Sequence, residues 1–321
     1  MTTKNFRFKG YLIALVVFTL AFFLSSSPAV QKALSPKPAE DLPVSGSLSE
    51  NGSTNPGEGS EDRVPEGTAV QVPILMYHAF TKGSTAESDL YVTEARFQQQ
   101  LSALQSAGYT FVTCRDLQDF VLAGKPLPQN PVLLTCDDGY LDNYEIAYPI
   151  LQQQNAKMTI FTVGMSFGKS TYRDTGHAIT PHFSFTQAAE MVASGCVEIG
   201  SHTYDMHRYA PYETGEARNG MEPLSTETYE TYLPLAESDL RYMSQVLTLV
   251  KGSNRTILAF PQGANHPWAQ EAAANCGITL TCTTQKGTNT LVAGSPETLL
   301  NLNRYTVTDD LSGGKLLQLL Q

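Results

Sequence analysis

The chain has few of the features that suit a protein to nucleic acids or nucleotides. Its 321 residues include 21 Lys and Arg against 31 Asp and Glu, for a formal net charge of −10 and an isoelectric point of about 5.1. Phosphate backbones are bound by clustered Lys and Arg, so the balance argues against nucleic acid as the main partner. No GxGxxG follows a predicted strand and no phosphate-binding loop occurs. A neutral or cationic glycan is compatible with this charge.

Cysteine is scarce, and none of it falls in a CxxC pair, so a structural zinc site built from cysteines is not expected. The five cysteines are Cys114, Cys136, Cys196, Cys276 and Cys282. A disulfide stays open for an exported chain, and the odd total leaves at least one thiol unpaired. Cys136 and Cys196 lie in or beside apolar runs and are expected to be small buried hydrophobes.

Residues 1–25 differ from the rest of the chain. Three basic residues precede an apolar run of 14 residues, 11–24, and serines close it. This pattern is typical of an export signal. The run is shorter than the ~20 residues of a comfortable membrane span, yet residues 26–29 match a cleavage site poorly. A signal peptide and a retained membrane anchor therefore both stay open, with a buried helix as the third reading.

Residues 26–69 are rich in Pro, Ser, Gly and Glu and poor in aromatics. Such a stretch has little to bury and is predicted to be a disordered linker. The folded domain is then expected over residues 70–321. A tether of this kind would place that domain at the extracellular face of the membrane, or the whole protein would be secreted.

From residue 70 onward, short apolar runs alternate with helical patterns. Strands are predicted over 72–77, 109–112, 132–136, 158–163, 197–201, 257–260, 278–282 and 302–307. Helices are predicted over 93–107, 116–122, 142–154, 186–194, 227–250, 267–275 and 315–320. The alternation predicts an α/β fold with a mainly parallel sheet. The number of repeats favours a closed or nearly closed barrel, in which chemistry lies at the carboxyl ends of the strands.

Two carboxylates, Asp137 and Asp138, directly follow the apolar strand 132–136. Adjacent like charges at the edge of a core are costly unless something neutralises them, and a divalent metal would do so. A helix cap would explain one Asp but not two, and Asp142 is the more natural cap. Gly139 then allows a tight turn.

Two histidines follow the strand 197–201. His202 and His207 are five residues apart, so they share no face of a regular helix or strand. They can converge only if the chain leaves the strand and bends. Two neutral imidazoles and one carboxylate, with open positions for water, form a catalytic ligand set for zinc or a similar metal. Two unrelated loop histidines are the alternative.

Taken in order, these groups resemble the polysaccharide deacetylase family, also called the NodB-homology group or carbohydrate esterase family four. The resemblance covers roughly residues 70–308. Its motifs are the strand 73–78, the TCDDG sequence at 135–139, the histidine pair and the FPQG sequence at 260–263. The paired-histidine spacing and the Phe at 260 are nearest to the poly-N-acetylglucosamine deacetylases.

The resemblance implies a distorted (β/α) barrel of about seven to eight strands and the hydrolysis of acetyl groups on sugars. It assigns Asp137 as the general base, and Asp138, His202 and His207 as ligands of a divalent metal, with zinc expected and cobalt or nickel as alternatives. The turn of Pro261, Gln262 and Gly263 would hold the oxyanion, through the Gln262 N–H. The implied partner is a glycan, peptidoglycan or an N-acetylglucosamine polymer; the oligomeric state stays open.

Three departures from the family pattern stand out. The histidine spacing is five where four is commonest, and Gln262 replaces the usual Tyr. The late Leu-x-His motif is absent, and no His follows His266, so the general acid is unassigned. His78, which ends the first strand, could face the site or form a local hydrogen bond, and we expect it to be structural or exposed rather than catalytic. The alternatives to a deacetylase are an inactive glycan-binding domain and another amide or ester hydrolase on the same barrel.

Overall fold

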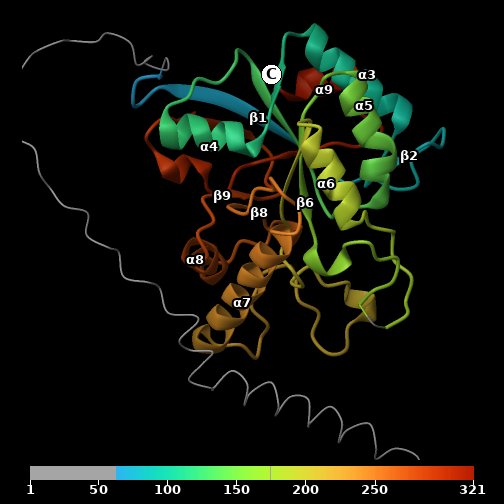
Figure 1. Cartoon of the computed structure of the whole chain (residues 1–321), viewed down its shortest axis with the longest axis vertical. Coiled ribbons are helices and arrows are strands. Elements are labelled where there is room, and N and C mark those ends of the chain that lie inside the picture. The colour runs from blue at the N-terminus through green and yellow to red at the C-terminus, as the bar shows by residue number, and fades with distance from the viewer. Residues whose placement is uncertain (1–62, 174) are drawn as a thin grey trace, which may run out of the picture. The chain divides into compact units, whose positions relative to one another are not determined.

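A curled sheet lies at the centre of the computed structural model, which describes residues 63–173 and 175–321 (Figure 1). Along the sheet the strands follow the order β10-β1-β5-β6-β7-β8-β9, with β11 paired to β1 and β4 paired to β5. The strands are β1 (Ala69–Tyr77), β4 (Thr110–Val112), β5 (Pro131–Cys136), β6 (Met158–Thr162), β7 (Val197–Ser201), β8 (Ile257–Ala259), β9 (Leu280–Cys282), β10 (Thr288–Val292) and β11 (Tyr305–Thr306). A separate parallel pair joins β2 (Ala79–Thr81) to β3 (Tyr91–Thr93).

Every strand pair in this sheet is parallel except β1 with β10. A parallel bridge between Cys282 and Leu302 also brings the chain that enters β11 beside the end of β9. The sheet is therefore a curled, mixed half-barrel. This confirms the predicted α/β class with a distorted barrel, and it puts the carboxyl ends of the parallel strands at one edge.

Helices flank the sheet, and Figure 1 shows α4 on one side of β1 and α3, α5 and α6 on the other. Their bounds are α3 (Glu94–Ser106), α4 (Cys114–Ala123), α5 (Tyr148–Gln153), α6 (Phe185–Ala193), α7 (Tyr229–Leu247), α8 (Pro267–Asn275) and α9 (Gly313–Leu319). A π-helical turn, η1 (Asn143–Ala147), precedes α5, and 3₁₀ turns are η2 (Gly164–Ser166), η3 (Ala210–Tyr212), η4 (Pro261–Gly263) and η5 (Pro296–Leu299).

Local chemistry fixes where the helices begin and end. Thr113 and Asp116 form a capping box at the start of α4, and Gly124 ends that helix in the left-handed region with φ 69°. Ser184 and Gln187 form the same box at the start of α6. These signals satisfy backbone groups that a helix leaves unpaired at its ends, so the predicted and observed bounds of both helices agree within two residues.

Two apolar clusters on the sheet fix the strands in place. One includes Leu75, Leu134 and Ile160 and packs with α3, α5 and α6. The other includes Leu133 and Phe161 and packs with α4. Because consecutive side chains on a strand point to opposite faces, both faces of β5 are buried. The residues directly after β5 are therefore the first in this segment whose side chains line the edge of the sheet instead of the apolar core.

Three strands were not predicted. β10, Thr288-Asn289-Thr290-Leu291-Val292, has three polar residues followed by two apolar ones, so its sequence gives no alternating signal, and it pairs antiparallel with β1. The strands β2 and β3 have three residues each, too short for a periodic signal. The predicted strand 302–307 is reduced to Tyr305–Thr306, since Asn301 has a positive φ and the segment around it turns.

All five cysteines are free thiols, so the disulfide left open by the sequence is not formed. Cys136 is buried as expected, whereas Cys196 is only half buried. Cys196 follows Gly195, which has φ 79° and ends the turn after α6. That turn keeps the thiol near the surface, where its Sγ lies 3.1 Å from Ser194 Oγ.

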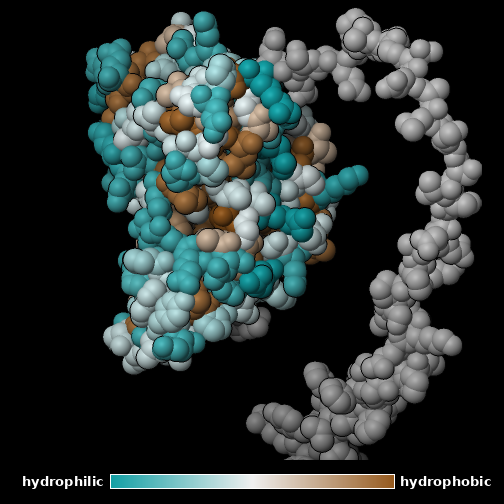
Figure 2. All heavy atoms as spheres, turned by 90° about the vertical axis from the view of Figure 1, so that its left-hand side faces the viewer, coloured by the Kyte–Doolittle hydropathy of each residue, from teal (hydrophilic) through white to brown (hydrophobic). Residues whose placement is uncertain are grey.

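The predicted signal or anchor, residues 1–25, lies outside the described residues. Among the described helices none is both long and apolar enough to span a bilayer. On the face in Figure 2, hydrophilic and hydrophobic side chains are interspersed. Within the predicted linker 26–69, the described part makes contacts with the sheet region: the Val64 N–H donates to Gly124 O and the Gly67 N–H to Ala293 O, both at 2.9 Å. The division at residue 70 remains a prediction.

Candidate active site

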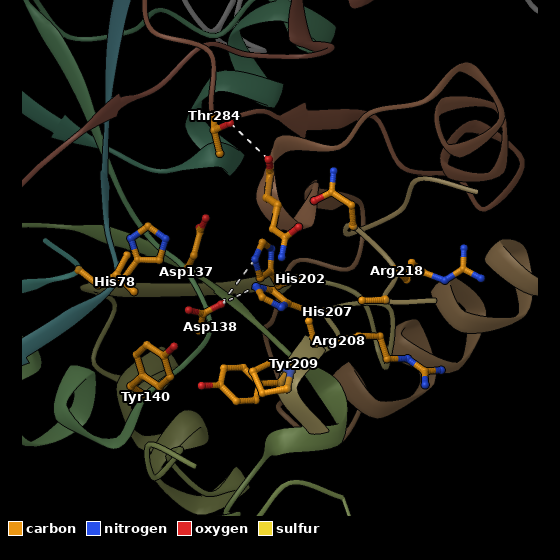
Figure 3. Close-up of a pocket in the computed structure, with 16 residues that line it drawn as sticks. His78, Asp137, Asp138, Tyr140, His202, His207, Arg208, Tyr209, Arg218 and Thr284 are labelled. Carbon is orange, nitrogen blue, oxygen red and sulfur yellow. Dashed lines mark hydrogen bonds and ion pairs between the residues drawn. The ribbon is translucent and has the colours of Figure 1, made fainter. Parts of the chain in front are cut away.

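The carboxyl ends of the strands contribute the polar side chains of one cavity, of 550 Å³ (Figure 3). We call it the catalytic cavity. Its strand-end residues are His78 after β1, Asp137 and Asp138 after β5, His202 after β7, Gln262 after β8 and Thr284 after β9. The parallel sheet thus joins groups that the sequence separates by up to about two hundred residues, as the barrel prediction required.

Asp137 is buried and held by two arms of one guanidinium. Arg304 Nη1 donates to Asp137 Oδ1 at 2.7 Å and Nη2 donates to Oδ2 at 2.8 Å. Burial alone would raise the pKa of Asp137, but the charges and hydrogen bonds around it, above all those of Arg304, lower it below its usual range. Asp137 is therefore a carboxylate at neutral pH.

Arg304 is itself fully buried and lies directly before β11. Its Nε donates to Thr283 O at 2.8 Å, and Nη1 also lies 3.3 Å from Thr135 Oγ1. With these bonds and the bidentate pair, the guanidinium is fixed on both sides. A buried charge of this kind is tolerated only when it is paired and hydrogen-bonded, so Arg304 and Asp137 depend on each other.

Asp138 faces the two histidines. Its Oδ1 lies 3.3 Å from His207 Nε2 and 3.6 Å from His202 Nε2 (Figure 3). The backbone of Asp138 has φ 73°, a conformation that L-residues other than Asn and Asp rarely adopt. Burial would raise the pKa of Asp138; the nearby charges, led by His207, and the hydroxyl of Tyr140 outweigh it and lower this pKa far below its usual range.

His202 is fixed by a backbone carbonyl. Its Nδ1 lies 2.8 Å from Ala259 O, and a carbonyl only accepts, so the proton is on Nδ1 and the Nε2 lone pair points at Asp138. Burial is the largest cause that lowers the pKa of His202, to about 4. The ring is therefore a neutral imidazole at pH 7, the form that ligates metals.

The loop between the two histidines bends so that both rings reach the cavity despite their separation of five residues. Thr203 has φ 69°, so the chain turns sharply after β7. Asp239 of α7 accepts the N–H groups of Tyr204 at 2.8 Å and Asp205 at 2.7 Å. The turn returns the chain to the cavity, and the rings of His202 and His207 lie 5.1 Å apart.

The donor set fits a divalent metal ion. One ligand atom from each of Asp138, His202 and His207 lies within 4.8 Å of the others. Two donors bound at ~2 Å in a tetrahedron stand about 3.3 Å apart, close to the separations seen here. Asp138 Oδ1 is buried and has no hydrogen-bond partner among the described residues. A buried carboxylate oxygen without a partner is costly, and a cation would satisfy it.

The turn at residues 261–263 borders the same cavity. Gln262 lines it with φ 58°, and Thr284 Oγ1 lies 3.5 Å from Gln262 O. Gly263 has φ 73°, and a Cβ there would lie 2.2 Å from Thr284 Oγ1. Pro261 and Gly263 shape the turn and do not line the cavity. Of the predicted oxyanion group, Gln262 is the member that reaches the site.

The sequence profile described as "Polysaccharide deacetylase" matches residues 124–281, which include both acids, both histidines and the turn at Gln262. The chain carries a polysaccharide deacetylase domain. Members of this family catalyse the N-deacetylation of sugars, a hydrolysis of an amide C–N bond. The resemblance stated from the motifs is confirmed.

Individual relatives of the deacetylase domain agree with this family. The Bacillus subtilis (strain 168) protein YxkH, named as a candidate polysaccharide deacetylase, is 27% identical over 243 residues, 76% of this chain and 74% of YxkH. The poly-beta-1,6-N-acetyl-D-glucosamine N-deacetylase of Staphylococcus aureus (strain MRSA252) is 24% identical over 201 residues, 59% of this chain and 63% of that enzyme. The chain thus covers less than two thirds of the second relative.

A solved structure extends the similarity to the fold. IcaB from Ammonifex degensii superposes with a TM-score of 0.61 at 27% sequence identity, over 79% of this chain and 97% of that one. The fold of the deacetylase domain is therefore similar to that of this solved structure.

Sequence reasoning missed three residues that the deacetylase domain places at or behind its site. Arg304 is the one charged residue within the predicted strand 302–307, and this could have marked it as a buried, paired cation. His78 was expected to be structural or exposed rather than catalytic, and the structure puts it on the wall of the catalytic cavity with Asp137 and Asp138. Asp239 gave no signal, because acids on a helix face are usually solvated.

Proposed function

We propose that the chain is a metal-dependent N-deacetylase that removes acetyl groups from N-acetylated sugars of an extracellular polysaccharide. The observation that carries the proposal is the buried Oδ1 of Asp138, which lies near His202 and His207 and accepts no hydrogen bond from the described residues. The ionised Asp137 lines the same cavity. Asp138 would thus bind the metal while Asp137 would accept a proton, and the hydrolysis needs both roles.

The residues Asp138, His202 and His207 would hold the ion. Two imidazoles and one carboxylate suit zinc first, with cobalt or nickel as substitutes in the same geometry. A divalent ion at this place supplies Lewis-acid polarisation of the acetyl carbonyl and lowers the pKa of water. His202 is orientated by Ala259 O, and that bond raises the basicity of its other nitrogen.

Asp137 is the proposed general base. Arg304 fixes both of its oxygens and keeps the carboxylate ionised, and Asp137 lines the catalytic cavity. A base must lie within hydrogen-bond reach of the proton that it takes, and Asp137 directly precedes the metal-binding residue Asp138. The proton of the attacking water would pass to Asp137 as the C–O bond to the acetyl carbon forms.

The developing oxyanion and the leaving amine need partners of their own. The oxyanion would be held by the backbone N–H of Gln262, and the proposal is supported by the position of this residue on the wall of the catalytic cavity. His78 takes the role for which the sequence offered no candidate. It shares the cavity with Asp137, so an imidazolium there would give its proton to the sugar nitrogen as the C–N bond breaks.

The proposed substrate class is an N-acetylglucosamine polymer or peptidoglycan. A relative named for poly-beta-1,6-N-acetyl-D-glucosamine supports the first. An export signal or anchor at residues 1–25, followed by a linker, would place the domain outside the cell, where such polymers occur. Zinc, an N-terminal membrane attachment and an extracellular location are all parts of this proposal.

The test is acetate release from β-1,6-linked N-acetylglucosamine oligomers, chitooligosaccharides and peptidoglycan, with zinc or cobalt added. Replacing Asp137 by Asn removes the base, so release should fall by about 10²–10⁴. Asp119→Asn is the matched control, because this acid on α4 pairs with Lys125 at the surface and does not line the catalytic cavity. Undiminished release by Asp137→Asn would refute the base assignment. Bound metal with no release from any substrate would favour the glycan-binding alternative.

A further inference from the structure

Two side chains hold the peptide unit that follows His78. The parallel ladder between β1 and β5 ends at the pair Tyr77 and Cys136, one residue before His78. Beyond that pair, Asn143 Nδ2 lies 2.8 Å from His78 O, and Cys136 Sγ lies 3.0 Å from the same oxygen. A carbonyl oxygen only accepts, so the amide and the thiol both donate to it. Side-chain donors thus continue the bonding of β1 where the ladder stops.

The nitrogen of the same peptide unit is anchored as well. The Ala79 N–H donates to Leu90 O at 3.1 Å, directly before β3. Because a peptide unit is planar, bonds to its oxygen and to its nitrogen fix the backbone on the carboxyl side of His78. The pairing of β1 fixes the backbone on the other side. The direction in which the imidazole leaves the backbone toward the catalytic cavity is therefore set (Figure 3).

The Asn143 amide is itself held in one orientation. Asn143 is fully buried at the start of the π-helical turn η1, and its Nδ2 also donates to Asp142 Oδ1 at 2.9 Å. Its Oδ1 is buried and accepts no hydrogen bond from the described residues. A buried amide with an unsatisfied oxygen costs free energy of folding, and short π-helical turns are common at functional sites. Both observations favour a role for Asn143 in the site.

We propose that Asn143 and Cys136 are positioning residues that fix the imidazole of His78 in the catalytic cavity. Under the proposed function, on which this inference rests, His78 gives its proton to the sugar nitrogen as the C–N bond breaks. The nitrogen leaves as the amine, and the acetyl group leaves as acetate with the oxygen of the attacking water. A misplacement of reacting groups by about 1 Å can cost about 10² in rate. Loss of the two bonds therefore slows protonation of the amine and leaves the attack on the carbonyl intact.

The test compares kcat for acetate release from a β-1,6-linked N-acetylglucosamine oligomer with kcat for nitrophenyl acetate, whose leaving group needs no proton. In Asn143→Leu we expect the oligomer kcat to fall about ten- to a hundredfold, with KM and the ester kcat near the wild-type values. The same substitution in a chain that carries His78→Ala should add no further loss, because Asn143 acts through that ring. Cys136→Ala removes the second donor and should lose more of the oligomer kcat than Cys136→Ser, which keeps a donor.

Asn289→Leu is the matched control for the loss of a buried amide. Asn289 is also buried and donates from Nδ2 to a carbonyl of β1, Val72 O at 3.3 Å, at a point on the strand away from His78. Thermal unfolding should show a loss of stability in this variant, while the ratio of the two kcat values stays that of the wild type. Equal losses on both substrates in Asn143→Leu, an additive loss with His78→Ala, or a changed ratio in Asn289→Leu would overturn the inference.

A readout without turnover separates this inference from the proposed function. In a chain with isotope-labelled histidine, the NMR order parameter of the His78 ring should fall in Asn143→Leu and stay at the wild-type value in Asn289→Leu. If the wild type releases no acetate but the order parameter falls in this way, then the positioning role stands and the enzymatic proposal fails. If acetate is released and neither the order parameter nor kcat depends on Asn143, then the inference fails alone.

Discussion

Replacing Arg304 by Met should both destabilise the fold and change the pH dependence of catalysis. The guanidinium is fully buried and makes two bonds to Asp137, at 2.7 and 2.8 Å. Removing one partner of a buried ion pair leaves the other charge without compensation, at a cost of about 3–5 kcal/mol. Urea unfolding measures this loss. The exposed Arg255 on the loop before β8 is the control, where Arg255→Met should change stability by less than about 0.5 kcal/mol.

The catalytic effect follows from the pKa of Asp137. In the wild type, burial tends to raise this pKa and Arg304, acting through its charge and its hydrogen bonds, lowers it below its ordinary value. A neighbouring arginine lowers an aspartate pKa by about 1–3 units, so its loss should move the acidic limb of the kcat/KM profile upward by about that much. The wild-type stability supplied by the lowered pKa is present above the unfolded value near 4 and is lost as the pH falls through the folded value.

A double variant decides whether the two residues act as a pair. Asp137→Asn combined with Arg304→Met removes both charges, so it should be less destabilised than the sum of the single variants by more than about 1 kcal/mol. Additive losses, a stability change within 1 kcal/mol for Arg304→Met, or an unmoved acidic limb would each contradict the reasoning. Arg304→Lys should rescue little, because an ammonium cannot reproduce the two parallel bonds.

Further predictions concern the metal and its loop. Zinc at a hundredfold excess over its Kd should stabilise the wild type by about 2.7 kcal/mol in thermal unfolding, and His207→Ala should abolish that gain. Asp239→Ala should weaken zinc binding about tenfold or more in a competition titration, because it frees the loop at Tyr204 and Asp205. Burial is the largest cause that raises the pKa of Asp239, to about 6. The contribution of the protonated Asp239 to the free energy of unfolding is therefore fully present below about pH 4 and is lost as the pH rises through about 6. Unfolding from pH 4 to about 7 should show Asp239→Asn gaining stability relative to the wild type; a constant difference would contradict this.

The parts of the fold and site that the sequence predicted are those with a local signal. An apolar run such as Val132–Cys136 followed by two acids can be recognised within a few residues, and parallel topology then places every such strand end at one edge. This is why Asp138, His202 and His207 were predicted as a cluster and found as one. The antiparallel strand β10 has no alternation of polar and apolar residues in its sequence, and its strand conformation comes with its pairing to β1.

The parts that the sequence did not predict depend on contacts between distant segments. The bond from Arg304 to Asp137 spans 167 residues, and that from Tyr204 to Asp239 spans 35. Neither the hydrophobic periodicity of the sequence nor the spacing of its motifs indicates such a pair. Arg304 and Asp239 share a second property: Arg304 holds the proposed base, and Asp239 holds the loop that carries a proposed ligand. Residues in such a role are constrained by geometry more than by chemical type.

The absent late histidine illustrates the difference. Reading the motifs alone, the lack of a His after His266 left catalysis without a proton donor. In the structure, the late segment contributes Arg304, which fixes the proposed base Asp137, while His78, directly after β1, lies on the cavity wall. A proton donor needs only to reach the leaving nitrogen, so its position along the chain is free. If this holds, His78→Ala should lower kcat for amide substrates far more than for an activated acetyl ester, whose leaving group needs no proton. Equal losses on both substrates would instead make His78 a residue that orders the cavity.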